Sequence, residues 1–263
     1  MRIAGRKLGA LSLLLCALLI LCGASCERKE ILQIGGSTTV QPLAEKWAEA
    51  FERRHPEIEV RVQGGGSSFG VRGCAEGILD IGAASRELSP EEKERWPELV
   101  PIPIALDAIA IVVNPQNPRE DITLDELREI FAAGTTDEWI AISRDPGSGT
   151  REVFEEKVMR GAPISSRCEF YPSNGAVREA VARNPKAIGY ISLGYVNEAV
   201  KALRVNGVTC TPENVREGKY PLVRTLYFIT RGEPRGKVKE FVDFCLGEEG
   251  QEIAEKEGYV RVK

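Results

Sequence analysis

Three short stretches rich in glycine and hydroxyl side chains each lie where a strand-like run of residues gives way to a helix-like run. They span residues 36–39, 64–68 and 147–150. Glycine lets the backbone approach a ligand closely, and the first N–H groups of a helix have no partner within that helix. Each stretch can therefore donate hydrogen bonds to an oxyanion. Together the three stretches predict parts of one anion-binding site.

A regular alternation of strand and helix patterns must position these stretches. Such alternation predicts an α/β fold with a largely parallel sheet, in which ligands bind beyond the carboxyl ends of the strands. Residues 99–113 hold two apolar strand runs. Further strands are expected at 31–34, 58–63, 79–84, 140–143, 188–191 and 227–229, and helices at 40–51, 67–77, 89–96, 123–134, 150–160, 175–183 and around 238–245.

The N-terminal segment is typical of a secretory signal peptide covering residues 1–25. Basic residues precede an apolar run from Leu8 to Leu21, which is too short for a comfortable membrane span. Cys26 follows in a setting similar to a bacterial lipobox, although Gly23 stands where that pattern has leucine. The sequence predicts an exported chain, periplasmic or at the cell surface, lipid-anchored through Cys26. Ordinary cleavage after Ser25 is the alternative.

The charge of the chain argues against a nucleic-acid partner. The 263-residue chain has a formal net charge of −4. Removal of residues 1–25 takes away three basic residues and lowers this charge to about −7. An acidic protein that binds an anion must do so through local donors rather than through its overall field.

Several longer motifs occur in an order that is familiar. The motifs are Ile34-Gly-Gly-Ser-Thr-Thr-Val-Gln-Pro-Leu43, Gly64-Gly-Gly-Ser-Ser-Phe-Gly70, Asp80-Ile-Gly-Ala-Ala-Ser-Arg-Glu-Leu88, Arg144-Asp-Pro-Gly-Ser-Gly-Thr150, Ala187-Ile-Gly-Tyr190, Gly232-Glu-Pro234 and Glu249-Gly-Gln251. Through these motifs the chain resembles the phosphate-binding proteins of bacterial phosphate ABC transporters, and the resemblance spans nearly all of the chain beyond the signal peptide.

The resemblance implies a two-lobed periplasmic-binding-protein fold of type II, with phosphate in a cleft that closes around it. Lobe one would comprise residues 30–110 and 222–263, and lobe two residues 111–221. Neutral donors would replace the hydration shell of the ion, and an arginine would supply a fixed positive charge. The implied ligand residues are Ser37, Thr38, Thr39, Ser67 and Ser68 of lobe one and Arg144, Ser148, Gly149 and Thr150 of lobe two.

More ordinary roles remain open for some of these residues. Ser67 and Ser68 are also typical of a flexible turn, and Ser148 and Thr150 of a helix N-cap. Four cysteines beyond Cys26 fit no metal motif, but export would allow two disulfides. With the lobes divided as above, Cys74 with Cys245 and Cys168 with Cys210 would each lie within one lobe. Free buried thiols are the alternative.

One position departs from the family pattern. Better-known members carry an aspartate after the Gly-Ala-Ser turn, and its carboxylate accepts the proton of phosphate, whereas this chain has Arg86 there. The departure puts discrimination against sulfate in doubt. Asp107, between the two strand runs, is the preferred replacement acceptor, and Asp80 and Asp145 are further candidates. Arg86 is expected either to point into the cleft or to pair with an acid at its rim.

The sequence therefore predicts a non-enzymatic receptor that captures inorganic phosphate for an ABC importer. No phosphate-binding P-loop motif is present, so the permease and the ATPase are expected to be separate subunits. We predict no cofactor, no metal and no catalytic residue. A binding protein for sulfate, molybdate or tungstate is the first alternative. A secreted phosphatase or a phosphate-sensing adaptor is the second, disfavoured because the serines have no histidine partner.

Overall fold

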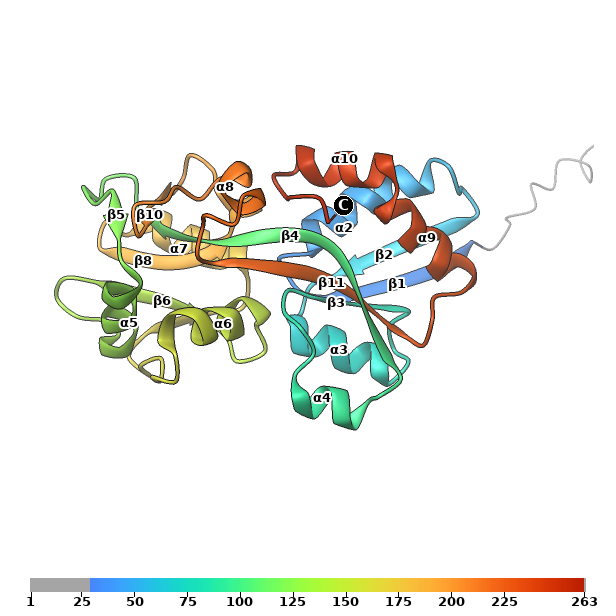
Figure 1. Cartoon of the computed structure of the whole chain (residues 1–263), viewed down its shortest axis with the longest axis horizontal. Coiled ribbons are helices and arrows are strands. Elements are labelled where there is room, and N and C mark those ends of the chain that lie inside the picture. Colours follow the sequence, from blue (N-terminus) through green and yellow to red (C-terminus); the bar gives the residue numbers. More distant parts are fainter. Residues whose placement is uncertain (1–28, 263) are drawn as a thin grey trace, which may run out of the picture.

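The computed structural model describes residues 29–262. The predicted signal peptide and the lipidation site at Cys26 lie outside these residues. The described chain forms two bodies joined by two long strands, and Figure 1 shows lobe one at the right and lobe two at the left. Within residues 29–262, no helix is sufficiently long and apolar to cross a membrane.

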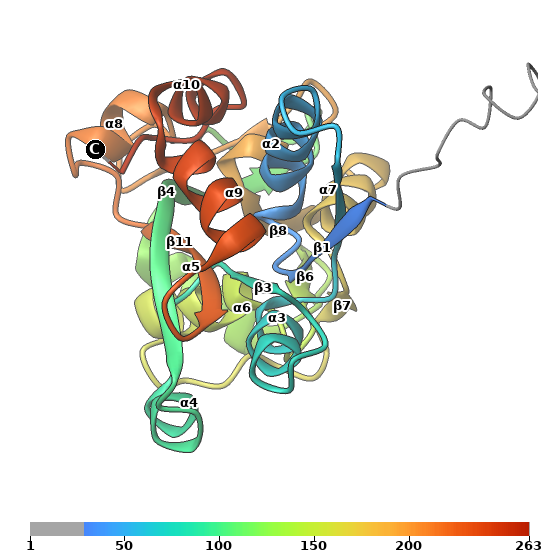
Figure 2. The same cartoon turned by 90° about the vertical axis from the view of Figure 1, so that its right-hand side faces the viewer.

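Lobe one combines the first third of the described chain with its C-terminal helices. Figure 2 shows α2, α9 and α10 on one face of its strands and α3 and α4 on the other. The elements of lobe one are β1 (Glu30–Gly36), α2 (Gln41–Glu52), β2 (Ile58–Gln63), α3 (Ser67–Ala75), β3 (Ile81–Ala84), α4 (Pro90–Arg95), α9 (Gly236–Leu246) and α10 (Glu248–Lys256).

Lobe two is formed by the middle of the chain. Its first helix begins with a capping box, in which Thr123 Oγ1 accepts from the Glu126 amide and the Glu126 carboxylate accepts from the Thr123 amide. The elements are β5 (Asp121–Ile122), α5 (Leu124–Ala133), β6 (Ile140–Arg144), α6 (Gly149–Phe154), the π-helical turn η1 (Glu155–Met159), β7 (Glu169–Tyr171), α7 (Asn174–Arg183), β8 (Ala187–Ser192), the 3-10 turn η2 (Leu193–Tyr195), β9 (Lys201–Ala202), β10 (Arg204–Val205) and α8 (Pro212–Arg216).

Two long strands, β4 (Leu99–Val113) and β11 (Val223–Arg231), run from one lobe into the other. The sheet order is β2-β1-β3-β11-β4-β8-β6-β7, with β9 also paired to β4, while β5 and β10 pair separately. The prediction of two strand runs at 99–113 was wrong, because these residues form one continuous strand. The prediction of a largely parallel sheet was also only partly right. The outer strands pair in parallel, but β4 and β11 are antiparallel to each other and to their neighbours β8 and β3.

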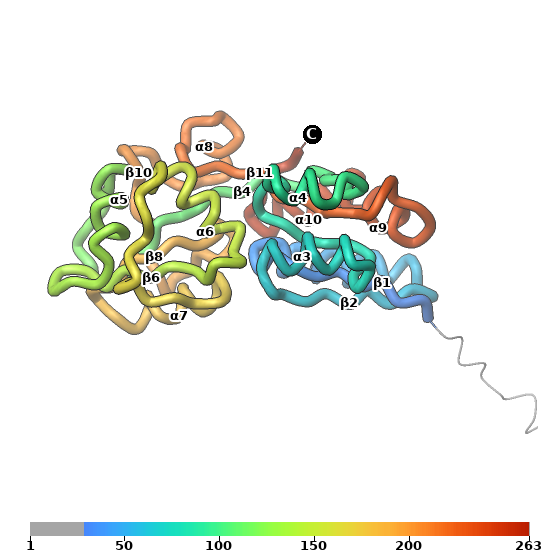
Figure 3. The backbone as a smooth tube through the Cα atoms, turned by 90° about the horizontal axis from the view of Figure 1, so that it is seen from below, coloured from blue at the N-terminus to red at the C-terminus, as the bar shows by residue number. Residues whose placement is uncertain are grey.

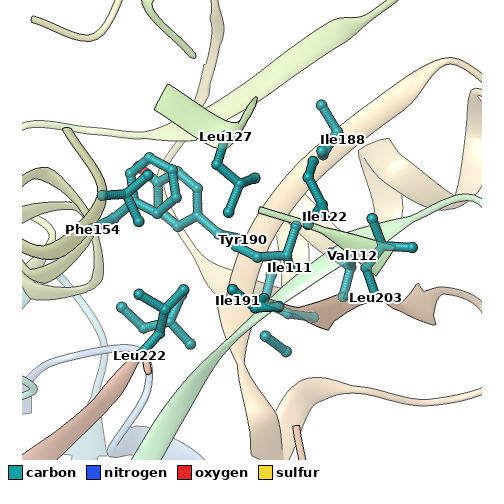
Figure 4. Packing of buried hydrophobic residues seen from close by; sticks show 14 of the residues in the cluster. Ile111, Val112, Ile122, Leu127, Phe154, Ile188, Tyr190, Ile191, Leu203 and Leu222 are labelled. Atoms are coloured by element: carbon teal, nitrogen blue, oxygen red, sulfur yellow. The ribbon is translucent and has the colours of Figure 1, made fainter. Parts of the chain in front are cut away.

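Each lobe has its own hydrophobic core. In lobe one, Trp47 and Phe51 pack with aromatic residues of β11 and α9. In lobe two, the Tyr190 ring stacks on Phe154 with 4.1 Å between ring centroids, and Figure 4 shows both rings among aliphatic side chains. The two cores meet between Ala105 and Ala108 on β4 and between Val223 and Leu226 on β11. The residue boundaries expected for the lobes stay a prediction.

The four cysteines of the described chain are buried and form no disulfide. Cys74 and Cys245 belong to different hydrophobic clusters of lobe one, so the possible bridge between them is not formed. Cys168 and Cys210 lie in the lobe-two core, again as free thiols. Burial raises the pKa of Cys168 to about 11, which keeps this thiol protonated and unreactive at neutral pH.

A close crossing of α3 over the sheet fixes where the helix begins, and Gly70 makes this crossing possible. A Cβ atom at this position would lie 2.5 Å from Ala83 O and 2.8 Å from Gly35 O. We expect Gly70→Ala to lower the free energy of unfolding by about 2 kcal/mol, as overpacking does. Urea denaturation followed by circular dichroism measures the change.

The matched control is Gly175→Ala in α7, where the nearest atoms to an added Cβ are 3.8 Å away. We expect this variant to unfold at the same urea concentration as the parent protein or slightly above it. Equal midpoints for Gly70→Ala and the parent would show that the helix crossing tolerates a side chain.

Candidate functional site

The loops that precede three helices bring their polar residues together between the lobes. Residues 37–39 connect β1 to α2, Ser67 opens α3, and Gly149 opens α6. Figure 3 shows the start of α3 facing the α6 side of lobe two. The two loops touch, since the Ser68 amide donates to Gly147 O at 3.3 Å. The amides of Ser67 in α3 and of Gly149 and Thr150 in α6, which have no partner within their helices, are available where the lobes meet.

Hydroxyl groups from both lobes approach one another at this meeting point. Thr39 Oγ1 of lobe one lies 3.3 Å from Thr150 Oγ1 of lobe two. Asn174 Nδ2, at the start of α7, donates to Thr39 Oγ1 at 3.0 Å and to Thr38 Oγ1 at 3.3 Å. All four side chains are buried. The predicted Thr38, Thr39 and Thr150 thus form one cluster, which Asn174 joins.

Arg144 brings a positive charge to the same cluster. Its Nε donates to Tyr171 O at 3.1 Å, and its Nη2 donates to Pro172 O at 3.0 Å and to Thr38 Oγ1 at 3.3 Å. The lobe-two core holds its backbone, because the Arg144 amide donates to the hydroxyl of the stacked Tyr190. Burial lowers the pKa of this guanidinium. Its Nη1 is buried and has no hydrogen-bond partner among residues 29–262.

A second buried arginine, Arg224 of β11, was not predicted from the sequence. Its Nη1 donates to Thr150 Oγ1 at 2.8 Å, and its Nη2 donates to Thr39 Oγ1 at 2.9 Å. Its Nε and Nη2 both donate to Asp107 Oδ2, at 2.9 and 2.8 Å. Ser192 Oγ donates to the other carboxylate oxygen at 2.9 Å. Burial raises the pKa of Asp107, and the charge of Arg224 opposes that rise.

Sequence reasoning also missed Asn174, Ser192 and Ser85. Ser85 directly follows β3, which is the same position relative to a strand that drew attention to the three glycine and serine stretches. A search of the sequence for serine at the ends of strands could therefore have found Ser85. Arg224 lies within an apolar strand, where an isolated arginine is itself unusual, but its partner Asp107 is 117 residues away in the chain. Only the strand pairing reveals this contact.

Three predicted hydroxyls bond within their own lobes. Ser37 Oγ accepts from the amide two residues further on, at 3.2 Å. Ser148 Oγ caps α6 by accepting from the Arg151 amide at 3.3 Å. Ser67 Oγ accepts from the Ser85 amide at 3.1 Å. These bonds fix the shape of the three loops.

Arg86 forms an ion-pair cluster with acids from both lobes. Its Nη1 and Nη2 donate to the two carboxylate oxygens of Glu92 at 2.7 and 2.8 Å, and its Nε lies 2.5 Å from Glu152 Oε2. Its Nη2 also donates to Ser68 Oγ at 3.3 Å. Burial alone would lower the pKa of Arg86, but the two carboxylates outweigh burial and raise it. Arg86 therefore pairs with acids, and it links lobe one to Glu152 of lobe two.

The other candidate acids lie in different settings. Asp80 Oδ2 accepts from the Gln33 amide at 2.8 Å, beyond the end of β3 opposite to the site. Asp145 Oδ1 lies 3.6 Å from Arg144 Nη2, and this oxygen is buried without a hydrogen-bond partner in the described chain. No three side chains among histidine, cysteine, aspartate and glutamate come together as a metal site within residues 29–262.

These features define a site that can donate many hydrogen bonds to a small anion shared by two lobes. The sequence profile of the PBP superfamily domain matches residues 23–249, so the chain belongs to the PBP superfamily. Within it, the chain belongs to the family of phosphate-binding proteins called PstS. PstS of Bacillus subtilis is 35% identical, over 88% of this chain and 80% of its own length. PstS of Borreliella burgdorferi is 29% identical, over 90% of this chain and 92% of its own length.

Solved structures agree with this assignment. A Clostridium perfringens protein assigned as a phosphate ABC transporter substrate-binding protein, crystallised with bound phosphate, superposes with a TM-score of 0.84. It is 36% identical and covers 89% of this chain and all of its own. A phosphate transport receptor of Vibrio cholerae gives a TM-score of 0.72 at 29% identity, covering 87% of this chain and 99% of its own.

Membership of this family confirms three predictions made from the sequence. The resemblance to phosphate-binding proteins was right, as was the two-lobed α/β fold of a periplasmic binding protein. The chain is a binding protein and not an enzyme. Proteins of this family are extracytoplasmic, which supports the predicted export of the chain.

Close approach of the lobes depends on the absence of a side chain at Gly149. A Cβ there would overlap Ser67 Oγ and lie 2.9 Å from Ser85 Oγ, both on the opposite lobe. We expect Gly149→Ala to weaken inorganic phosphate binding at least about tenfold, because misplacement of the loops lengthens several hydrogen bonds at once. Isothermal titration calorimetry measures the affinity.

Gly147→Ala, two residues away, provides the control. Its added Cβ would meet its nearest neighbour at 3.7 Å, an ordinary contact distance. We expect its phosphate affinity to stay within about threefold of that of the parent protein. If both variants bound phosphate like the parent, phosphate binding would not depend on the close approach of Gly149 to Ser67 and Ser85.

Proposed function

We propose that this protein captures inorganic phosphate outside the cytoplasm and delivers it to the permease and ATPase subunits of an ABC importer. The observation that carries this proposal is Arg144 Nη1, a buried cationic donor without a partner in the described chain. An unpaired buried donor is costly, and an anion beside it would remove the cost. The names of the relatives, and the phosphate bound in the Clostridium perfringens protein, favour phosphate as that anion.

The proposed ligand set combines the hydroxyl cluster with the helix starts. Residues 37–39 and 67–68 would donate from lobe one, and Arg144 and residues 148–150 from lobe two. Residues 30–110 with 222–263 and residues 111–221 would move as two bodies about β4 and β11. In this proposal Ser37 and Ser148 act mainly by shaping their loops, since each accepts a hydrogen bond from a nearby amide.

The proposal includes membrane attachment. Cys26 follows small residues at the end of the predicted signal peptide, and a lipidated cysteine there would become the mature N-terminus. The first strand begins at Glu30, so an anchor at Cys26 would hold lobe one close to the membrane surface and to a permease within it. No part of the anion site would contact lipid.

Binding of another tetrahedral oxyanion is a second candidate function. Both oxygens of Asp107 already accept hydrogen bonds, and Arg86 lies in an ion-pair cluster. Arg86 cannot accept a proton, and the Asp107 carboxylate is already engaged by Arg224 and Ser192, so neither residue is reserved for the proton of phosphate, which favours sulfate as a competitor. Asp145 Oδ1 favours phosphate, because it is a buried acceptor without a partner in the described chain and lies beside Arg144.

The test is calorimetric titration of anion-free protein with phosphate, sulfate and molybdate. We expect phosphate to bind tightest, and Arg144→Ala to weaken its binding about a hundredfold through loss of charge-assisted hydrogen bonds. Arg183→Ala, at an arginine whose side chain is 81% exposed, is the matched control and should bind like the parent. Tighter binding of sulfate or molybdate would reject phosphate as the ligand. Unchanged affinity in Arg144→Ala would remove that residue from the site.

A further inference from the structure

The pair formed by Asp107 and Arg224 lies on the two strands that connect the lobes. Asp107 of β4 and Arg224 of β11 are direct partners in the antiparallel register. Their side chains are 0% and 2% exposed, and two N–H groups of the arginine bond to one carboxylate oxygen. A buried pair held by two such bonds has a fixed geometry. The guanidinium is therefore presented to the site in one orientation.

That orientation determines how the Thr39 hydroxyl can bond. A hydroxyl group has one proton to donate and two lone pairs that accept. Thr39 Oγ1 accepts from Arg224 Nη2 at 2.9 Å and from Asn174 Nδ2 at 3.0 Å. Because these two N–H groups can only donate, they occupy both lone pairs. The hydroxyl of Thr39 is left with its proton alone, so it can act only as a donor.

The hydroxyls of the neighbouring Thr38 and Thr150 are also biased toward donating hydrogen bonds. Thr150 Oγ1 accepts from Arg224 Nη1 at 2.8 Å and lies 3.3 Å from Thr39 Oγ1. Thr38 Oγ1 accepts from Arg144 Nη2 and Asn174 Nδ2, both at 3.3 Å. Hydroxyls in water or in an ordinary turn can donate or accept. Here fixed N–H donors bias three of them toward donation.

We propose that Arg224 is a positioning residue that gives the site its preference for acceptor-rich anions by making the Thr39 and Thr150 hydroxyls donors. Asp107 acts through Arg224, by holding the guanidinium where it reaches both lobes, and Ser192 holds the carboxylate in turn. The ligand class that follows is a small oxyanion rich in acceptor oxygens. Ligands whose polar groups can only donate, such as ammonium ions, are excluded because they would face donors.

Lysine could not replace Arg224 in this role. The guanidinium places separate N–H groups on Asp107, Thr39 and Thr150 at the same time, whereas an ammonium is a single point at the end of a flexible chain. The inference rests on the proposed function in one respect, namely that the site binds a tetrahedral oxyanion. It adds the identity of the residues that make the hydroxyls of the site hydrogen-bond donors.

A double-mutant cycle on anion affinity tests the proposal. Arg224→Met alone would leave the buried Asp107 carboxylate without its ion-pair partner, so both residues are replaced together as Arg224→Met/Asp107→Leu. Phosphate and sulfate affinities are measured by calorimetry for this variant, for Thr39→Val and for the combination. We expect the pair variant to lose about 50-fold in phosphate affinity and Thr39→Val about tenfold, and the combination to be within about threefold of the pair variant.

The cycle separates positioning from independent contributions. If Arg224 acts through the threonine, removal of the hydroxyl costs little once the arginine is gone. A loss in the combined variant equal to the product of the two separate losses overturns the proposal, as does unchanged affinity in the pair variant. Sulfate affinity should fall in parallel with phosphate affinity. A selective loss of phosphate binding would instead make Asp107 the direct acceptor of the ligand's proton.

Two controls complete the design. Arg61→Met/Glu59→Leu removes an exposed ion pair on β2 by the same substitutions and should bind phosphate like the parent. Arg224→Lys keeps a cation beside Asp107, so it tests the idea even if the pair variant fails to fold. In that background Thr39→Val should also cost less than about threefold, and a full tenfold cost would contradict the proposal.

The outcome for the parent protein distinguishes this inference from the proposed function. If the parent binds sulfate but not phosphate, phosphate is rejected as the ligand, and the cycle is run with sulfate to judge Arg224. If the parent binds neither phosphate, sulfate nor molybdate, both proposals are overturned.

Discussion

The buried ion pair between Asp107 and Arg224 is the interaction on which the geometry of the site depends. Two charges withdrawn from water are tolerated only when their hydrogen bonds are complete, and here Arg224 and Ser192 complete those of the carboxylate. The pair lies on β4 and β11, which belong to both lobes. Thr39 of lobe one and Thr150 of lobe two bond to the same guanidinium, so its orientation fixes the positions of hydroxyls from both lobes.

The site combines this arginine with donors that carry no net charge. Each of the three buried arginines near the interface has a carboxylate beside it: Asp107 for Arg224, Asp145 for Arg144, and Glu92 with Glu152 for Arg86. The local charge is therefore nearly balanced before an anion arrives. Affinity must come from aligned hydroxyls, amides and Arg144 Nη1, which has no partner within residues 29–262, as expected for an acidic chain that binds an anion.

The sequence predicted the parts of the site whose signals are local. Glycine, serine and threonine at the ends of strands mark helix starts wherever they occur, and the Thr123 capping box lies within four residues. Arg224 and Asn174 could not be found in this way, because their partners Asp107 and Thr39 are 117 and 135 residues away from them in the chain. Asp107 is recognisable in the sequence as one acid among apolar residues, but the sequence does not show that Arg224 is its partner. The same long-range pairing explains why β4 is one strand and why the centre of the sheet is antiparallel.

The position of Arg224 on a connecting strand has a consequence for anyone who would rebuild this protein as an optical sensor for anions. Such sensors convert movement of two lobes into a signal, and their selectivity is usually adjusted by changing residues in the cleft. Here the residue that polarises the cleft is also part of the strand pair about which the lobes would move. Changes made there would alter the dynamic range together with the affinity for the ion. The loop at 64–68 lies away from β4 and β11 in the sequence and is the more independent site for redesign, whereas Thr150 in the loop at 147–150 bonds directly to Arg224.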